Sequence, residues 1–385
     1  MINAVPSARD LVLIGGGHTH ALLLKRWGMN PLSGVRVTLI DPVPETAYTG
    51  MLPGFIAGHY PRDALNIDLV RLARHAGASF VHSAANGIDL TARTVKVSDQ
   101  PAIRYDALSI DIGVHSGLSG LGQAVSAKPL AAFAAAWAEF LKRDIEDPHV
   151  LFLGGGLAGC ELALAAAHRL QEKRAKVSLI ERSSEVLAGL SAGQRRLLLK
   201  ALQDANIQVH LNREVSHLER NVLTFTDGPS VQADFVVSAA GAKPYAWLAE
   251  TDLPLHDGFI CVDKHLRVTG GHPTVFAVGD CAHMTCSPRP KAGVFAVRQA
   301  PVLDQNIRAI LGDGKLRPYR PQKDYLKLVS LGERSCAAFK FGFAVKGRRL
   351  WALKNRIDQR FLGGLKDLPD MPALRPAHAR TAGGE

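Results

Sequence analysis

The sequence predicts an α/β fold with two parallel-sheet domains of similar construction, followed by a small C-terminal α+β segment. Residues 11–41 contain an apolar run, a glycine-rich turn, a helical stretch and a second apolar run, and residues 150–181 repeat this order. After residue 325 the pattern changes to two alternating segments and a basic helical stretch. A chain of 385 residues has room for two or three domains, which fits this division.

The composition is that of a globular protein, with 47% hydrophobic and 21% charged residues. The net charge of +11 is concentrated between Arg334 and Lys366, where nine basic residues accompany a single acid. Five cysteines without a CxxC pair exclude a disulfide scaffold and a cysteine-based zinc site, so no metal is expected, and their odd number fits a reducing compartment. No signal sequence is expected, and the most apolar stretch, Val150–Ala167, contains Glu161 and four glycines, so no membrane span is expected.

Each of the two units carries the residue types of a dinucleotide-binding turn. The first glycine permits a tight turn, the second lets the backbone approach a pyrophosphate at the helix N-terminus, and the third allows close helix–strand packing. An acid at the end of the next strand accepts hydrogen bonds from a ribose, and it follows the first glycine by 26 residues in one unit and 27 in the other. These positions are Gly15, Gly17 and Asp41 in the first unit and Gly154, Gly156, Gly159 and Glu181 in the second. The matched spacing predicts two Rossmann-like domains.

The first unit departs from this pattern because His20 occupies its third glycine position, which requires a wider gap between helix and strand. His18 lies at the turn, where a ring nitrogen could reach a cofactor. A packed or locally hydrogen-bonded imidazole explains either histidine equally well. In the second unit Glu181 is placed to repel a 2′-phosphate, which favours NADH over NADPH, and the adjacent Arg182 moderates that preference.

The chain resembles the flavoproteins with two dinucleotide-binding domains, the pyridine nucleotide-disulfide oxidoreductase superfamily, over about residues 10–310. The likeness rests on Gly154–Glu161, Leu108–Gly113, Val236–Pro244 and Thr274–Asp280. It implies FAD in the first domain and NAD(H) in a second domain inserted into the first. The domains implied are 1–115 and 246–322 for FAD, 116–245 for NAD(H), and 323–385 as a C-terminal interface or membrane-surface segment. The cofactor-binding residues implied are Gly15, Gly17, His18, Asp41, Met51, Leu52, Gly113, Gly279, Asp280, Gly154, Gly156, Gly159, Glu181 and Gly241.

Within this group, the stretch Ala47–Gly58 separates the chain from the disulfide reductases, which place a redox-active CxxxxC pair there. The stretch has no cysteine, and Cys281 and Cys286 follow the Gly-Asp motif instead, in the wrong part of the sheet. Electrons are therefore expected to leave the flavin directly for an acceptor. Together with the turn at residues 15–20, the stretch looks like the flavoprotein module found fused to selenide, water dikinase, which is related to type II NADH dehydrogenases and sulfide:quinone reductases.

Two residues are predicted to be catalytic. Lys291 begins a helix to about Leu311, and the resemblance places the N-terminus of this helix beneath the flavin ring, where lysine and helix would stabilise negative charge on reduction. A solvent-exposed lysine in the first turn is an equal alternative. Glu161 is similar to a glutamate near the nicotinamide–flavin junction of relatives. Taken alone, it is a carboxylate suited to the first turn of a helix.

The C-terminal segment is predicted to contain strands at Tyr325–Leu331 and Ser335–Phe341 and a basic helix at Arg348–Leu362. An apolar stripe runs along this helix through Leu350, Leu353, Ile357 and Phe361. Basic residues beside an apolar stripe suit the surface of an anionic membrane. A helix that caps the flavin site or joins a homodimer is a near-even alternative. The basic residues accompany no nucleic-acid-binding motif, so no nucleic-acid partner is expected.

The function expected is that of an FAD-dependent NADH dehydrogenase that passes electrons to a quinone-like acceptor, in the cytoplasm or at the inner face of the cell membrane. Type II NADH dehydrogenases carry two quinone-site glutamines on the helix after Lys291, and the matching positions here hold Val294 and Arg298, with Gln299 beside the second. The alternatives are a sulfide:quinone-type reductase, for which Cys160 and Cys336 are poorly placed, a reductase of selenium or sulfur compounds, a reductase of a soluble protein, and an NADH-sensing binding protein.

Overall fold

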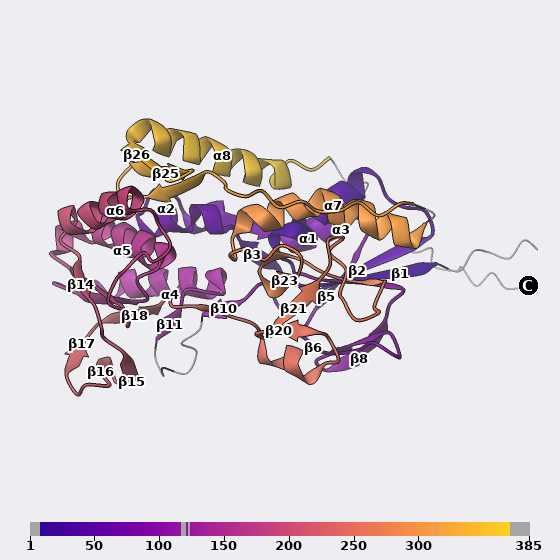
Figure 1. Cartoon of the computed structure of the whole chain (residues 1–385), viewed down its shortest axis with the longest axis horizontal. Helices are drawn as coiled ribbons and strands as arrows, with labels where there is room; N and C mark the ends of the chain where they lie inside the picture. The colour runs from indigo at the N-terminus through magenta and orange to yellow at the C-terminus, as the bar shows by residue number, and fades with distance from the viewer. Residues whose placement is uncertain (1–7, 117–120, 122–123, 313, 370–385) are drawn as a thin grey trace, which may run out of the picture.

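The computed structural model describes residues 8–116, 121, 124–312 and 314–369. Its first sheet is parallel throughout (Figure 1). In spatial order the strands are β22 (Val275–Ala277), β9 (Ala107–Ile110), β1 (Arg9–Ile14), β2 (Val35–Asp41) and β5 (Ser79–His82). The apolar run Leu11–Ile14 in β1 is buried, as expected for a central strand with both faces covered.

The second sheet repeats the construction of the first. Its strands, again all parallel, are β11 (Val125–Ser126), β18 (Phe235–Ser238), β12 (His149–Leu153), β13 (Lys176–Ile180) and β14 (Gln208–His210). The central strand β12 lies between β13 and β18, just as β1 lies between β2 and β9. In both sheets a glycine turn leads from the central strand into a helix.

The chain passes between the two sheets at β10 (His115–Ser116) and β19 (Ala242–Lys243), which pair with each other antiparallel. Because β22 belongs to the first sheet but follows the whole second sheet in sequence, the second domain is inserted into the first. The predicted fold class is confirmed. We retain the domain ranges 1–115, 116–245, 246–322 and 323–385 as a proposal, of which 1–7, 117–120, 122–123, 313 and 370–385 lie outside the described residues.

The helices of the two domains are α1 (His18–Met29), α2 (Leu52–Ile56), α3 (Leu69–His75), α4 (Leu130–Lys142), α5 (Leu157–Arg169), α6 (Ala192–Asp204) and α7 (Gly293–Leu311). Five 3₁₀ helices, η1 (Thr49–Met51), η2 (Arg62–Leu65), η3 (Gln171–Lys173), η4 (Ala246–Glu250) and η5 (Gly279–Cys281), connect other elements of the described chain. Helix α6 begins with a capping box between Ser191 and Gln194. By contrast, the N-cap residues of α1 and α5 are Gly17 and Gly156, which have no side chain that could cap the helix.

Smaller antiparallel or mixed sheets flank the two domains. They are β3 (Glu45–Ala47) with β4 (Asn66–Asp68); β6 (Ala85–Asp89), β7 (Thr94–Val97) and β8 (Gln100–Arg104); β15 (Val215–Glu219), β16 (Val222–Phe225) and β17 (Ser230–Gln232); and β20 (Leu255–His256), β21 (Phe259–Val262) and β23 (Ala282–Met284). In the described chain no helix combines the length and the apolar character that crossing a membrane requires.

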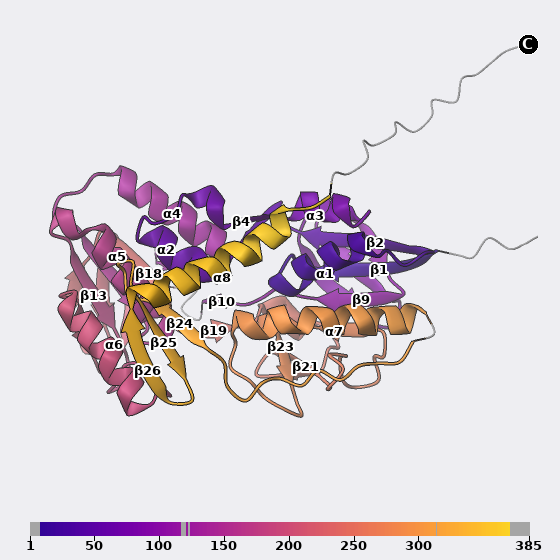
Figure 2. The same ribbon diagram turned by 90° about the horizontal axis from the view of Figure 1, so that it is seen from above.

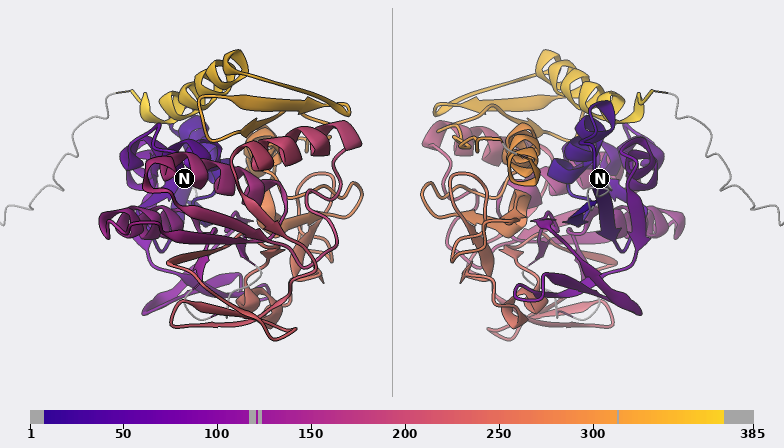
Figure 3. Two further views of the ribbon diagram at one scale, coloured as in Figure 1. Left: turned by 90° about the vertical axis from the view of Figure 1, so that its left-hand side faces the viewer. Right: turned by 90° about the vertical axis from the view of Figure 1, so that its right-hand side faces the viewer.

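The C-terminal segment forms a three-stranded sheet and a helix that lie across both domains (Figures 1 and 3). The elements are β24 (Lys327–Ser330), β25 (Cys336–Lys340), β26 (Phe343–Gly347) and α8 (Arg348–Lys366). The sequence predicts the first two strands and the helix, but it misses β26 and ends the helix at Leu362, one turn early. Seen from above, α8 runs from the hairpin over α2 toward α1 and α3 (Figure 2).

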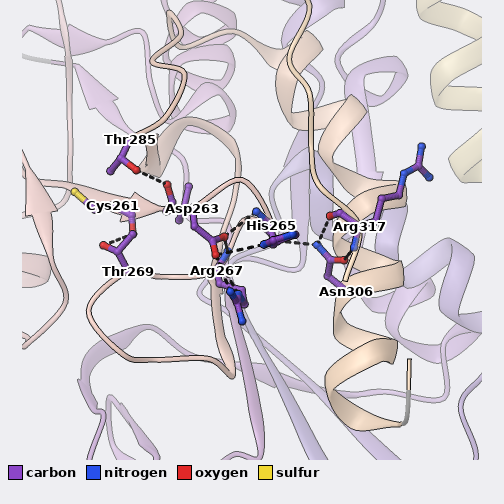
Figure 4. A network of polar contacts seen from close by, with 9 residues as sticks. Cys261, Asp263, His265, Arg267, Thr269, Thr285, Asn306 and Arg317 are labelled. Atoms are coloured by element: carbon purple, nitrogen blue, oxygen red, sulfur yellow. Dashed lines mark hydrogen bonds and ion pairs between the residues drawn. The ribbon is translucent and has the colours of Figure 1, made fainter. Parts of the chain in front are cut away.

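A polar network fastens the chain after α7 to the loop that follows β21 (Figure 4). Asn306, fully buried on α7, donates from Nδ2 to the carbonyls of His265 and Arg317 and accepts from the Arg317 N–H at 2.6 Å. Asp263 accepts from the N–H groups of His265 and Arg267 and from the Arg267 guanidinium. The Asn306 bonds hold the segment after α7 against the loop that follows β21 before the chain continues into the C-terminal sheet.

Candidate functional site

The first glycine turn has the geometry that the sequence predicts. Gly15 adopts φ +88°, and a Cβ there would lie 2.4 Å from the carbonyl oxygen of Asp111, so another residue would clash. Asp41 ends β2 and accepts from the Gly16 N–H at 2.6 Å and the Val43 N–H at 2.9 Å. Burial raises the pKa of Asp41, and these two hydrogen bonds oppose the rise. The acid therefore lies against the turn.

The two histidines of this turn differ in their surroundings. His20 is fully buried, its Nδ1 lies 2.6 Å from the Gly15 carbonyl and its Nε2 lies 2.8 Å from Ser109 Oγ, so it is a packed, satisfied imidazole. Nε2 of His18 is buried without a hydrogen-bond partner among the described residues, and its ring lies near Tyr48 and Phe361. Burial lowers the pKa of each histidine to about 4. His18 thus has an unsatisfied nitrogen that a ligand could meet.

The second glycine turn also matches its prediction. Gly154 adopts φ +109°, and a Cβ on Gly159 would lie 2.0 Å from the Gly154 carbonyl oxygen. A Cβ on Gly156 would meet nothing within 4 Å, which leaves space at the start of α5. Glu181 accepts from the Gly155 N–H at 2.7 Å and the Ser183 N–H at 2.8 Å. Burial raises the pKa of Glu181, but these bonds outweigh it and the pKa is lowered, so the carboxylate is charged.

The Gly-Asp motif at the end of β22 meets the first glycine turn. Cβ atoms built on Gly17 and Gly279 would each lie within 2.4 Å of Asp111 Oδ1, so all three residues converge. Asp280 pairs with Lys128 at 2.8 Å. Lys128 lies 152 residues away, between β11 of the second sheet and α4, and no sequence pattern marks it.

Gln299 has a structural use in this region. Its side chain is buried and its Oε1 accepts from the Gly279 N–H at 2.7 Å, so it holds the Gly-Asp turn. Val294 is half-buried in the first turn of α7, and Arg298 is exposed. The side-chain oxygen of Gln299, the glutamine beside the predicted quinone positions, is therefore already hydrogen-bonded to the Gly-Asp turn.

Lys291 lies two residues before α7 rather than in its first turn, because the helix begins at Gly293. The alternative of a solvent-exposed lysine is wrong: Nζ donates to the Ala282 carbonyl at 2.5 Å and lies 4.0 Å from the centre of the Phe259 ring. Burial lowers the pKa of Lys291. Lys291 lines a cavity together with Asp280, so a predicted catalytic residue and a predicted cofactor-binding residue line the same cavity.

Glu161 lies in the second turn of α5, not the first, and it faces the C-terminal segment. Its Oε1 accepts from the Ser330 N–H at 2.6 Å. Burial raises its pKa to about 7, which the charge of Lys354 opposes. The carboxyl group thus exchanges its proton near neutral pH.

Helix α8 brings charged side chains to the same place. Lys354 donates to Asp358 Oδ2 at 2.7 Å and to the Gly50 carbonyl, and Tyr48 donates to Asp358 Oδ1 at 3.0 Å. We call Tyr48, Glu161, Lys354 and Asp358 the buried polar cluster. Sequence reasoning missed three of its members. The i,i+4 spacing of Lys354 and Asp358, the single acid of a basic helix, was the available signal.

The remaining predicted binding residues surround these turns. Met51 and Leu52 are buried where η1 passes into α2, next to the Gly50 carbonyl that Lys354 holds. Gly113 and Gly241 adopt φ +65° and +58° beside the crossing strands β10 and β19. The structure therefore gathers Met51, Leu52, His18 and the cluster on one side of the first turn, whereas Gly241 belongs to the second domain.

The five cysteines are free thiols. Cys281 is buried and Cys286 is exposed, so no dithiol pair lies after the Gly-Asp motif. Burial raises the pKa of Cys160, Cys281 and Cys336 to about 12, so these thiols are protonated and weakly nucleophilic. Groups of three or more residues suited to a metal are likewise absent from the described part of the chain.

Two observations test whether FAD and NAD(H) fit this site. The glycine turns keep Cβ atoms away from the starts of α1 and α5, and an acid ends the next strand in both domains. The buried, unsatisfied Nε2 of His18 adds a polar atom that a bound group could satisfy. The residues present therefore fit a dinucleotide in each domain.

The comparisons with known proteins agree with this geometry. The alternative NAD(P)H-ubiquinone oxidoreductase C1 of Arabidopsis thaliana is 28% identical over 368 residues, which cover 84% of this chain and 70% of that protein. The fold is similar to NDH2 from Plasmodium falciparum, solved in complex with NADH (TM-score 0.77, 14% identity, 95% of this chain and 99% of that one). It is also similar to the sulfide:quinone oxidoreductase of Aquifex aeolicus (TM-score 0.76, 18% identity, 95% and 93%).

Residues 9–300 match the family described as pyridine nucleotide-disulphide oxidoreductase, which is about three-quarters of the chain. The match spans both glycine turns, the Gly-Asp motif and the start of α7, so it covers the convergent part of the site and leaves out the C-terminal segment. The predicted membership is thereby confirmed. The chain is an oxidoreductase that belongs to the pyridine nucleotide-disulphide oxidoreductase family, with FAD and NAD(H) as its cofactors.

Proposed function

We propose that this protein is an NADH dehydrogenase that passes electrons through FAD to a quinone at a membrane surface. The observation that carries the proposal is the orientation of α8. Its polar residues Lys354 and Asp358 face the body of the molecule, whereas Leu353 and Ile357 are 42% and 46% exposed. A helix that turns this ion pair inward and leaves apolar side chains exposed beside basic ones has an outer face suited to an anionic lipid surface. The ubiquinone-reducing activity in the name of the Arabidopsis relative supports the same acceptor.

We assign the two dinucleotides to the two turns. Gly154, Gly156 and Gly159 would hold NADH at the start of α5, and the charged Glu181 would accept the ribose hydroxyls and repel a 2′-phosphate. FAD would be held in the first domain by the residues that converge there, namely Gly15, Gly17, His18, Asp41, Met51, Leu52, Gly113, Gly279 and Asp280. When bound, FAD supplies the ring chemistry that accepts hydride and returns electrons.

The buried polar cluster is proposed to serve the acceptor. Reduction of a quinone to a quinol consumes two protons along with two electrons, so a proton donor close to the acceptor is required. The Glu161 carboxyl group exchanges its proton near neutral pH, and it lies close to the pair of Lys354 and Asp358. Lys354 also holds the Gly50 carbonyl next to Met51. We assign the delivery of a proton to Glu161. Lys291 and the N-terminus of α7 are assigned the stabilisation of negative charge on the reduced flavin.

The membrane contact is proposed to include the β25–β26 hairpin as well as α8. Phe341, Phe343 and Val345 are 68%, 79% and 59% exposed at the end of this hairpin and along β26. Exposed basic residues accompany them on the same segment: Lys340, Lys346, Arg348, Arg349, Arg356 and Arg360. Apolar side chains among basic ones match an anionic lipid surface. The single acid of the hairpin and α8, Asp358, is buried, so a second copy of the chain would find no exposed acid there to pair with these basic residues.

Replacing Phe341 and Phe343 by serine is expected to lower the affinity for anionic vesicles by at least about tenfold, since each buried phenyl ring contributes about 1.5–3 kcal/mol. Co-sedimentation with vesicles of phosphatidylglycerol and phosphatidylcholine measures this, and added salt should weaken binding of both proteins. The M29S/V43S double variant removes two exposed apolar side chains outside the segment and should bind like wild type. Unchanged vesicle binding, or a dimer that F341S/F343S dissociates, would contradict the membrane contact.

Anaerobic stopped-flow spectroscopy tests the function as a whole. NADH is expected to bleach the flavin band near about 450 nm, and a short-chain quinone is expected to restore it rapidly. Because Glu181 repels a 2′-phosphate, NADPH should bleach it at least about tenfold more slowly. Bleaching by NADH without recovery on addition of quinone would leave the NADH reaction in place and refute the quinone acceptor. Bleaching by sulfide would favour the sulfide:quinone alternative.

A further inference from the structure

The two glycine turns offer an internal comparison. In the first sheet Ile14 of β1 lies opposite Ile110, and in the second sheet Leu153 of β12 lies opposite Ser238. The next residue in each case donates its N–H back to the central strand at 2.8 Å: Asp111 to Ile14 and Ala239 to Leu153. Asp111 therefore holds in the first domain the position that Ala239 holds in the second.

Asp111 uses this position to cap α1. Its Oδ2 accepts from the N–H groups of Thr19 at 3.0 Å and His20 at 3.1 Å, and its side chain is almost completely buried. The equivalent N–H groups of α5, those of Ala158 and Gly159, have no side-chain acceptor among the described residues. A carboxyl group thus occupies the start of α1, whereas the start of α5 is open.

The start of α1 is also where the pyrophosphate of a dinucleotide binds, because free N–H groups and the helix dipole attract anions there. Asp111 Oδ1 lies against Gly17 and Gly279, where the two motifs of the first domain converge. A charged carboxylate at this point would repel the two negative charges of a pyrophosphate. A protonated carboxyl group would not, and it could donate a hydrogen bond.

We propose that Asp111 is a positioning residue that must be protonated for the first domain to take FAD, so that FAD binding takes up one proton and weakens as the pH rises. The proposal rests on the assignment of FAD to the first domain. It makes the loading of this domain dependent on pH, while the second domain, with Ala239 in the same place, binds NADH without that dependence.

The groups around Asp111 leave it as the residue that titrates near neutral pH. From α1, Thr19 and His20 present their N–H groups to Asp111, while the His20 imidazole is bonded to Gly15 and Ser109. Burial lowers the pKa of His20, and of His18 on the same helix, to about 4, so both are neutral above pH 6. Asp280 and Cys281 face it from η5. Asp280 is paired with Lys128, and burial keeps the Cys281 thiol protonated with a pKa of about 12. Burial raises the pKa of Asp111 itself to about 7.

Titration of the FAD-free full-length chain with FAD between pH 6 and 8.5, by calorimetry and by quenching of flavin fluorescence, tests the proposal. Above about pH 7 the Kd is expected to rise about tenfold per pH unit, the slope that uptake of one proton imposes. Calorimetry in buffers of different ionisation enthalpy should show an uptake of one proton per FAD at pH 8. The Kd for NADH, measured by its own fluorescence, should stay constant over the same range.

Two variants sharpen the test. Asp111→Asn keeps an acceptor for the Thr19 and His20 N–H groups without the charge, and Asp111→Ala copies the second domain. Both should bind FAD at least tenfold more tightly than wild type at pH 8.5 and show no pH dependence. A flat wild-type Kd, no proton uptake, or a pH dependence retained in D111N would overturn the proposal, and the wild-type calorimetry decides even if the variants misfold. These outcomes leave the quinone activity untouched, whereas absence of FAD binding at every pH would overturn both.

Discussion

Replacing Asp358 by alanine is expected to lower the free energy of unfolding by about 3–5 kcal/mol, the cost of leaving one partner of a buried ion pair uncompensated. The side chains of Lys354 and Asp358 are only 12% and 7% exposed. Without the carboxylate, the ammonium group of Lys354 loses its ion-pair partner and is left with the Gly50 carbonyl and the nearby Glu161 carboxyl group, and the Tyr48 hydroxyl loses its acceptor. Urea unfolding, followed by far-UV circular dichroism, measures the change.

Lys200 and Asp204 on α6 provide a matched control, since they form the same i,i+4 pair with side chains 67% and 51% exposed. Asp204→Ala should cost about 0.5 kcal/mol or less. Replacing both members of the buried pair, as in K354M/D358L, should cost less than D358A alone, because it removes the charges together. If D358A and D204A cost the same, Lys354 and Asp358 do not form a desolvated pair and the C-terminal segment is held by other contacts.

Much of the fold could be predicted because it depends on local, repeated patterns. Buried runs such as Leu11–Ile14 are continuous in sequence, and the glycines at 15 and 154 are required by positive φ values. Both features are properties of a few adjacent residues. The acids Asp41 and Glu181 could be found for the same reason, since a fixed chain length separates them from their turns.

The site could be predicted only in part because its remaining members meet through tertiary packing. Lys128 reaches Asp280 and Tyr48 reaches Asp358 across 152 and 310 residues, and no local pattern encodes either contact. The apolar stripe of α8 did not show which of its residues face the protein, because that depends on the tertiary fold: the half-buried Phe361 packs near His18, whereas Leu353 and Ile357 are exposed. The sequence did not mark Asp111 as a site residue, although it lies in the stretch Leu108–Gly113. Its position at the start of α1 becomes clear only when the two sheets are compared and Ala239 is found in the same place.

Replacing Glu161 by glutamine is expected to slow the restoration of the flavin band by quinone about 100-fold while leaving its bleaching by NADH unchanged. General acid catalysis contributes at least this much when the donor is well placed. Glutamine keeps an oxygen for the Ser330 N–H, so the contact with β24 survives the change. Glu139→Gln, which alters an exposed carboxylate on α4, is the control and should change neither rate.

The pH dependence distinguishes a proton donor from a structural residue. Burial raises the pKa of Glu161 to about 7, so the protonated form that can donate predominates below that pH. The rate of flavin recovery with quinone should therefore be constant below about pH 7 and fall about tenfold per pH unit above it, and E161Q should be slow at every pH. A base would give the opposite slope. A recovery rate that rises with pH, or an E161Q protein with the wild-type profile, would remove Glu161 from the proton path and leave it as a contact between α5 and the C-terminal sheet.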